Sequence, residues 1–150
     1  MSYSPTSFNP QTATTFANAS GYQNGTVSTM AIATSVSTNG SGQLVLTDVT
    51  NEALSEGWLG LVAQSLPSAA IGQVVTDGRI QNIPSGLGFS VGDPIWVGNT
   101  PGTLTNVRPD VTVPGWSVGD YVLFVGVVVQ NEYNPSNQDI QISRQIIGQL

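Results

Sequence analysis

The stretch GFSVGDPIWVG at residues 88–98 returns with changes as GWSVGDYVLFVG at residues 115–126. Both copies contain a glycine, an aromatic residue, Ser-Val-Gly-Asp and then a hydrophobic strand that ends in glycine. Gly92 and Gly119 can adopt a positive φ angle, at which a Cβ atom would clash. The aspartate after each glycine can bond nearby backbone N–H groups and fix a turn. We therefore predict two equivalent turns, each leading into a strand of one small β-domain.

Asp93 and Asp120 in these two turns could instead share a metal or catalytic site. A Gly-Asp pair before a strand is common in turns, so we expect both aspartates to accept hydrogen bonds from nearby backbone N–H groups. A solenoid is excluded because it needs at least about three repeats.

Alternating apolar residues and Gly/Pro turns continue on both sides of the repeat. Residues 27–36 and 44–49 flank an Asn-Gly turn and predict a hairpin. The Asp77-Gly78 pair lies between two more apolar runs and predicts either another hairpin or a bulge in one strand. Residues 122–129 are almost continuously apolar. Such a run predicts burial on both faces, in the centre of a sheet or under a partner subunit.

The fold class follows from the density of strands and turns. The one place for a helix is residues 48–56, where Thr50 and two glutamates could start a short segment that Gly57 stops. We predict an all-β fold, a small β-barrel or sandwich over residues 27–150. An extended N-terminal arm over residues 1–26 precedes it.

The predicted arm carries no charge but contains single aromatic residues spaced through Ser, Thr and Asn. A disordered tail usually has more charge and fewer aromatics. We expect four aromatic side chains of the arm to bind a partner: Tyr3, Phe8, Phe16 and Tyr22. The alternative is a floppy terminus.

The other end of the chain is apolar. Ile146, Ile147 and Leu150 lie in the last five residues, where they would form an exposed patch on a monomer. We therefore expect these residues to form an oligomer interface.

The composition argues against catalysis. The chain has no His and no Cys, so Ser-His-Asp and Cys-His constellations cannot form and the usual zinc ligands are missing. The carboxylates show neither the pairing that a glycosidase needs nor an EF-hand calcium loop. We expect no enzyme activity, no catalytic residues, no cofactor and no metal.

Charge is sparse and negative. Charged residues make up 8% of the chain and the formal net charge is −6, whereas a typical soluble domain has about 25% charged residues. The only cations are Arg79, Arg108 and Arg144, so we expect neither nucleic acid nor a membrane as partner. So little charge suits a subunit that is packed into a large assembly.

Five segments follow one another in an order that carries a family resemblance: WLGLV (58–62), GQVVTDGRI (72–80), GDPIWVG (92–98), TPGTLT (100–105) and VGVV (125–128). This order resembles the small β-domain of capsid decoration (cement) proteins of tailed bacteriophages, and of some tail-fibre modules. The resemblance covers residues 57–143. It implies an all-β fold, usually a trimer, with no catalytic residues to carry over. The arm and the second turn at residues 115–120 lie outside the pattern.

The resemblance implies a virion structural protein on the capsid exterior. Its expected role is to decorate the head as a homotrimer, bind the major capsid protein and stabilise neighbouring capsid subunits. The alternative is a tail-fibre or tail-tip module that binds a host glycan through exposed Trp58, Trp96 or Trp116. For Trp96 and Trp116 we favour core packing, because both lie in the repeated turn segments.

Overall fold

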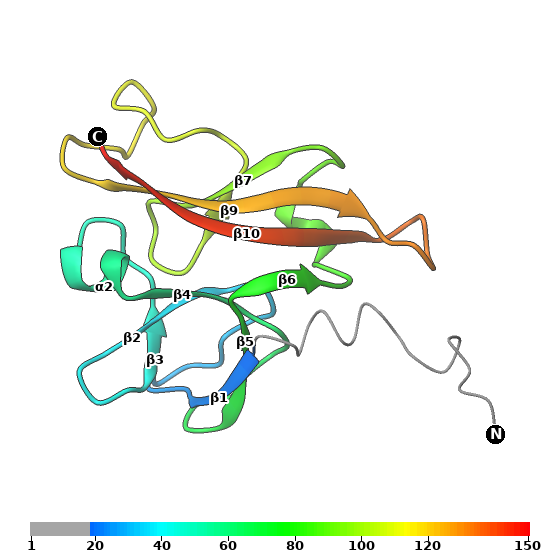
Figure 1. Ribbon diagram of the computed structural model, residues 1–150, viewed down its shortest axis with the longest axis horizontal. Helices are drawn as coiled ribbons and strands as arrows, with labels where there is room; N and C mark the ends of the chain where they lie inside the picture. The colour runs from blue at the N-terminus through cyan, green and yellow to red at the C-terminus, as the bar shows by residue number, and fades with distance from the viewer. Residues whose placement is uncertain (1–18) are drawn as a thin grey trace.

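Two antiparallel five-stranded sheets pack face to face in the computed structural model, which describes residues 19–150 (Figure 1). In spatial order, the first sheet contains β1 (Ala19–Gln23), β5 (Ile71–Val75), β4 (Trp58–Val62), β2 (Ser35–Thr38) and β3 (Leu44–Leu46). The second contains β6 (Asp77–Ile80), β10 (Gln138–Gln149), β9 (Tyr121–Gln130), β7 (Pro94–Val97) and β8 (Leu104–Thr105). The predicted all-β class is confirmed, and the sheets form a sandwich rather than a closed barrel.

The main core lies between the two sheets. Side chains alternate between the faces of a strand, so each sheet sends one set of residues inward. Leu61 and Val75 of the first sheet meet Ile95, Leu123 and Ile140 of the second, and all five are fully buried. Burial of such a side chain contributes about 1.5–3 kcal/mol, so this layer holds the sheets together.

A second, smaller core covers the opposite face of the first sheet. Val36, Val62 and Val74 point to that face, and Met30 and Leu66 close over them. The backbones of Met30 and Leu66 exchange two hydrogen bonds of 2.9 and 2.8 Å. Strands β4 and β5 are therefore buried on both faces, and their sequences lack a clean apolar–polar alternation for that reason.

The predicted hairpin after residue 27 forms, but it is shorter than predicted. Strand β2 pairs antiparallel with β3 and begins only at Ser35. Ala33 has a φ angle of 68°, which a regular strand does not allow. Before it, Met30 belongs to the second core and Ile32 packs against the main core, instead of extending the hairpin.

The predicted hairpin at Asp77-Gly78 is wrong. Strands β5 and β6 belong to different sheets, with a bend at Thr76 between them. Gly78 has a φ angle of 116°, which glycine adopts readily. The chain thus crosses from one sheet to the other as a bent strand, which is closer to the bulge alternative.

The two repeated turns have the same conformation, as predicted. Gly92 and Gly119 have φ angles of 94° and 97°. In each turn the aspartate carboxylate accepts a hydrogen bond of 2.9 Å from the backbone N–H of the serine three residues earlier. The N–H of the aspartate in turn donates to the carbonyl of that serine, at 3.0 and 3.1 Å. We call these turns the first corner (residues 88–93) and the second corner (residues 115–120).

Each corner clamps the end of a neighbouring strand. The first corner exchanges backbone hydrogen bonds of 2.8 and 3.0 Å with Val128 of β9, and the second exchanges bonds of 2.8 and 2.9 Å with Leu150 after β10. Asp93 and Asp120 therefore lie at opposite ends of β9, roughly 25 Å apart at ~3.3 Å per residue. The alternative of one metal or catalytic site shared by these acids is wrong.

The predicted short helix is confirmed as α2 (Glu52–Glu56). Asn51 caps it, because its Oδ1 atom accepts a hydrogen bond of 3.1 Å from the N–H of Leu54. Gly57 ends the helix. A short 3₁₀ turn, η2 (Ser85–Leu87), precedes the first corner.

The predicted boundary between arm and domain is wrong for the described residues. Strand β1 pairs along its length with β5, and Asn24 is buried, with its Nδ2 atom donating to the carbonyls of Ser28 and Leu66 at 3.0 Å each. Residues 19–26 therefore belong to the sandwich. Their inclusion follows from pairing with β5, which the local sequence does not reveal.

Tyr22 packs against the second core of its own chain. This role differs from the predicted one as an anchor on a partner, and it arises because β1 places Tyr22 beside the loop after β4. The other predicted anchors, Tyr3, Phe8 and Phe16, lie outside the described residues.

The corner geometry predicts a specific effect of Gly119→Ala. A Cβ atom at Gly119 would meet no atom within 4 Å, and the same holds at Gly40. Of these two glycines, only Gly119 has a positive φ angle. We expect Gly119→Ala to lower the free energy of unfolding by about 1–2 kcal/mol, and Gly40→Ala to change it by less than about 0.5 kcal/mol. Urea denaturation of both variants measures the difference, and equal effects would contradict the φ argument.

The position of β1 predicts the outcome of two truncations. Deletion of residues 1–18 should leave the melting temperature nearly unchanged, because every described strand remains. Deletion of residues 1–26 removes β1, Tyr22 and the two buried bonds of Asn24, and should cost at least about 3 kcal/mol. Thermal melts followed by circular dichroism test both. Equal stability of the two truncated chains would mean that residues 19–26 do not stabilise the fold, and would support the predicted boundary between arm and domain at residue 26.

Candidate interaction surface

Strand β10 has neighbours of unequal length. It spans 12 residues and pairs with β9 from Gln138 to Gln149. On its other side β6 pairs only with Ile140–Ser143. Within residues 19–150, no strand pairs with the remaining stretch, residues 144–149, on that side, and Figure 1 shows β10 running on beyond β6. We call this stretch the open edge.

The open edge presents two of the predicted interface residues. Ile146 is 48% exposed and Ile147 is 51% exposed. Leu150 differs, because its backbone is clamped by the second corner and its side chain packs against the main core. Ile146 and Ile147 therefore lie where a partner could contact them, whereas Leu150 already serves its own fold.

The one cation of the open edge, Arg144, is an exposed residue that contacts the first sheet. The Arg144 guanidinium donates a hydrogen bond to the backbone carbonyl of Trp58 in β4 and lies over the Trp58 ring at 5.7 Å from its centroid. Residues 145–150 carry no charge at all. Exposed strand edges usually carry charges or prolines that block pairing with another chain. Residues 145–150 have no charged side chain and no proline, but the pairing of β10 with β9 shifts register between Ile142 and Gln145 and again between Ile146 and Gly148. A strand added to this edge would therefore pair along a bulged backbone.

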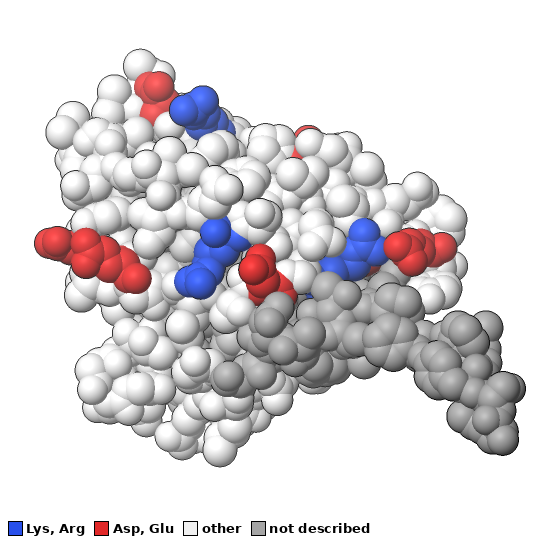
Figure 2. All heavy atoms as spheres, viewed as in Figure 1, with Lys and Arg blue, Asp and Glu red and all other residues white. Residues whose placement is uncertain are grey.

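Charge is scarce over the surface as a whole. Figure 2 shows the charged side chains as separate spots, with broad uncharged areas between them. Most other exposed apolar side chains lie in loops and turns or at strand ends, such as Val27, Ile71, Val118 and Tyr133, whereas Val127 lies within β9. The open edge is the place where two exposed isoleucines adjoin unpaired backbone of the same strand.

The tryptophans do not form the predicted glycan surface. Trp58 is 1% exposed and Trp116 is 8% exposed, so neither can stack on a sugar. Core packing of Trp116 is confirmed. Trp96 is only partly buried. It packs on the outer face of the second sheet, edge-on to Phe124, with 5.0 Å between the two ring centroids. The Arg108 guanidinium lies 5.9 Å from the centroid of the Trp96 ring.

The acids with shifted pKa values have structural partners. The amide of Asn106 and, to a smaller extent, the N–H of Ser90 lower the pKa of Asp93. Burial raises the pKa of the Tyr121 hydroxyl, and the nearby carboxylates of Glu52 and Glu56 add to this effect. Among residues 19–150 no three potential metal-binding side chains of His, Cys, Asp or Glu gather at one place. These shifts therefore come from turns and packing.

Within the described part of the chain, every helix is too short or too polar to cross a bilayer.

Comparison with known proteins gives no relative. No protein-family model matches the chain, and no curated protein matches it significantly. The function is therefore inferred from the geometry of the surface.

Sequence reasoning located Ile146 and Ile147 but missed the open backbone beside them. The partners of a strand depend on the whole topology, and the β10 sequence shows only that it is a strand. The length mismatch between β10 and β6 could have been suspected from the short run between Asp77 and Pro84.

The open edge predicts a test of self-association. Ile147→Lys should raise the dissociation constant of any oligomer at least about 10-fold, because a desolvated ammonium replaces buried apolar surface. Val27→Lys is the matched control, since Val27 is 98% exposed but lies in a loop. Light scattering across a concentration series measures both. An effect of Val27→Lys as large as that of Ile147→Lys would argue against the open edge.

Proposed function

We propose that the protein is a non-catalytic structural subunit of a bacteriophage virion, which decorates the exterior of the capsid. The observation that carries this proposal is the open edge, with its exposed Ile146 and Ile147 and a single charged side chain, Arg144, which is bonded to the carbonyl of Trp58. The low charge of the whole chain supports the same role, since a subunit held in an assembly needs little charge to stay dispersed. The order of sequence segments that resembles decoration proteins adds the virion as the setting.

The subunits associate as a homotrimer in this proposal. A ring of three requires a heterologous contact, in which the open edge of one copy meets a different surface of the next. Addition of a strand to an open edge supplies backbone hydrogen bonds, while alternate side chains provide specificity. The open edge carries no acidic side chain, so copies with a net charge of −6 can approach there without like charges at that edge.

Stabilisation of the head follows from mass action. A protein that binds the assembled shell of the major capsid protein, and not its free subunits, stabilises the shell by RT ln(1 + [L]/Kd) at each site. This amounts to about 2.7 kcal/mol when the free concentration is 100 times Kd. The role requires no catalytic residue, cofactor or metal, only a folded subunit and a complementary surface.

A tail-fibre or tail-tip module is the competing assignment. Its expected glycan contacts through tryptophan lose support, because Trp58 and Trp116 are buried and Trp96 is packed between Phe124 and Arg108. Decoration is therefore the proposal that the surface supports better.

Quantitative mass spectrometry of purified particles of the encoding phage tests the proposal. We expect a copy number close to that of the major capsid protein or a simple fraction of it, and release of the protein should lower the temperature at which heads open. Separation of heads from tails provides the control. A copy number near that of tail proteins, or its recovery with tails alone, would favour the tail module, and its absence from particles would overturn a virion role.

A further inference from the structure

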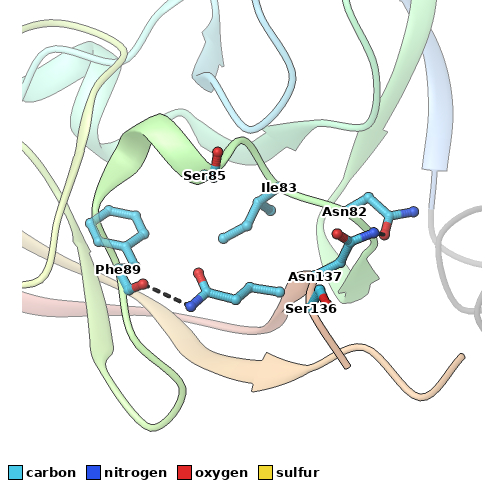
Figure 3. Close-up of a pocket in the computed structure, with 7 residues that line it drawn as sticks. Asn82, Ile83, Ser85, Phe89, Ser136 and Asn137 are labelled. Carbon is cyan, nitrogen blue, oxygen red and sulfur yellow. Dashed lines mark hydrogen bonds between the residues drawn. The ribbon is translucent and has the colours of Figure 1, made fainter. Parts of the chain in front are cut away.

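A pocket of about 240 Å³ opens at the end of the sandwich away from the open edge. It lies between the loop after β6 and the turn that joins β9 to β10, as Figure 3 shows. Its lining contains amides, hydroxyls and two apolar side chains and no charged group: Asn82, Ile83, Ser85, Phe89, Ser136, Asn137 and Gln138. This volume is below the ~300–1,000 Å³ of sites for drug-sized ligands, so it suits a ligand of one small ring.

A buried polar network fixes one wall of the pocket. Asp139 is fully buried. Its Oδ1 atom accepts hydrogen bonds from the backbone N–H of Asn82 at 2.9 Å and from Nδ2 of Asn131 at 3.0 Å. Arg79 lies 3.9 Å from its Oδ2 atom and balances the charge. Asn82 has a φ angle of 56°, in the left-handed region that asparagine adopts more readily than most residues other than glycine.

The network leaves hydrogen-bonding groups of the lining free. Asn137 donates through Nδ2 to Oδ1 of Asn82 at 2.8 Å, and Gln138 donates through Nε2 to the carbonyl of Phe89 at 2.8 Å. These bonds fix both amides and leave Oδ1 of Asn137 and Oε1 of Gln138 without a partner among the described residues. The hydroxyls of Ser85 and Ser136 have no such partner either. The lining thus offers two oriented acceptors and two adaptable hydroxyls.

The other walls are apolar. Ile83 is 6% exposed, and Phe89 is partly buried against the main core. Figure 3 shows Phe89 across the hollow from the Asn82–Asn137 pair, with Ile83 between them. A ligand that fits must therefore present O–H or N–H donors to one wall and C–H groups to the other.

We propose that this pocket binds a single neutral sugar ring, as a free monosaccharide or as one residue of a glycan. Sugars carry hydroxyl groups around the ring edge and C–H groups on the ring faces, and both match the two kinds of wall. No cation lines the pocket to bind a phosphate or carboxylate, and no carboxylate lines it to hold a metal ion. The buried network preorganises the amides, which reduces the ordering cost of binding. The proposal is independent of the virion role.

Nitrogen-15 NMR titration of the full chain tests the site. The probes are the methyl glycosides of glucose, galactose and mannose, and N-acetylglucosamine, with N-acetylneuraminic acid as an anionic comparison. We expect at least one neutral sugar to shift the backbone amides of Asn82, Ile83 and Gln138 in a saturable way. No saturable shift with any neutral sugar, or a shift with the anionic sugar alone, overturns the proposal.

Three variants locate the binding. Asn137→Ala removes an acceptor and should weaken binding at least about 10-fold. Gln141→Ala should leave binding unchanged, because Gln141 is an exposed amide on the same strand that donates outside the pocket, to the carbonyl of Gly78. Ser136→Tyr fills the hollow from an exposed turn position and should abolish binding while the fold remains. Binding that survives Ser136→Tyr places the sugar elsewhere and refutes this site.

Discussion

The sandwich depends on backbone pairing at the two corners. Each corner needs a glycine with a positive φ angle, followed by an aspartate whose carboxylate closes the turn. Each then exchanges a pair of backbone hydrogen bonds with the end of a neighbouring strand, at Val128 or at Leu150. The first corner leads into β7 and fixes its register against β9, and the second corner leads into β9 and fixes its register against the C-terminal end of β10.

The register of these strands determines what the surface presents. Strand β10 must run its full length beside β9, since the second corner holds Leu150. Its other neighbour, β6, is short because the chain bends at Thr76 into the first sheet. The open edge is therefore a result of topology. Arg144 completes it by turning toward Trp58, which leaves Ile146 and Ile147 beside uncharged residues.

The same register also forms the pocket at the other end. The turn between β9 and β10 brings Asn131 and Asn137 beside the loop that contains Asn82. Asp139 at the start of β10 then binds both the loop and the turn. A partly exposed group of amides in the loop and the turn is thus held next to a buried acid at the start of β10.

The sequence predicted what depends on local chemistry. The corners, the short helix and the burial of β9 all follow from turn residues and apolar runs within about ten positions, although the helix is capped by Asn51 and not by Thr50. The crossing at Thr76 could not be predicted, because Asp-Gly chemistry suits a hairpin and a bent strand equally well. Strand β1 was missed because its neutral polar residues show no strand pattern, and the strand forms only through pairing with the distant β5.

The candidate sites follow the same division. Ile146 and Ile147 were predicted from their apolar character alone. The amide pocket was missed because asparagine and glutamine are common in turns of this chain, and no spacing separates those held by Asp139 from the rest. Long-range pairing between residues 82 and 137 creates the site, and a single sequence carries no signal for it.

The two ends of the described chain differ in how they would respond to a mechanical load. Strand β1 lies at the edge of its sheet and pairs only with β5, so a pull on its free end would break hydrogen bonds one after another. Strand β10 lies inside its sheet between β9 and β6, and its end is clamped by the second corner. Tension applied along its C-terminus would load the ladder with β9 in shear, so that many hydrogen bonds must fail together. Under such a load the N-terminal strand would separate before the C-terminal one.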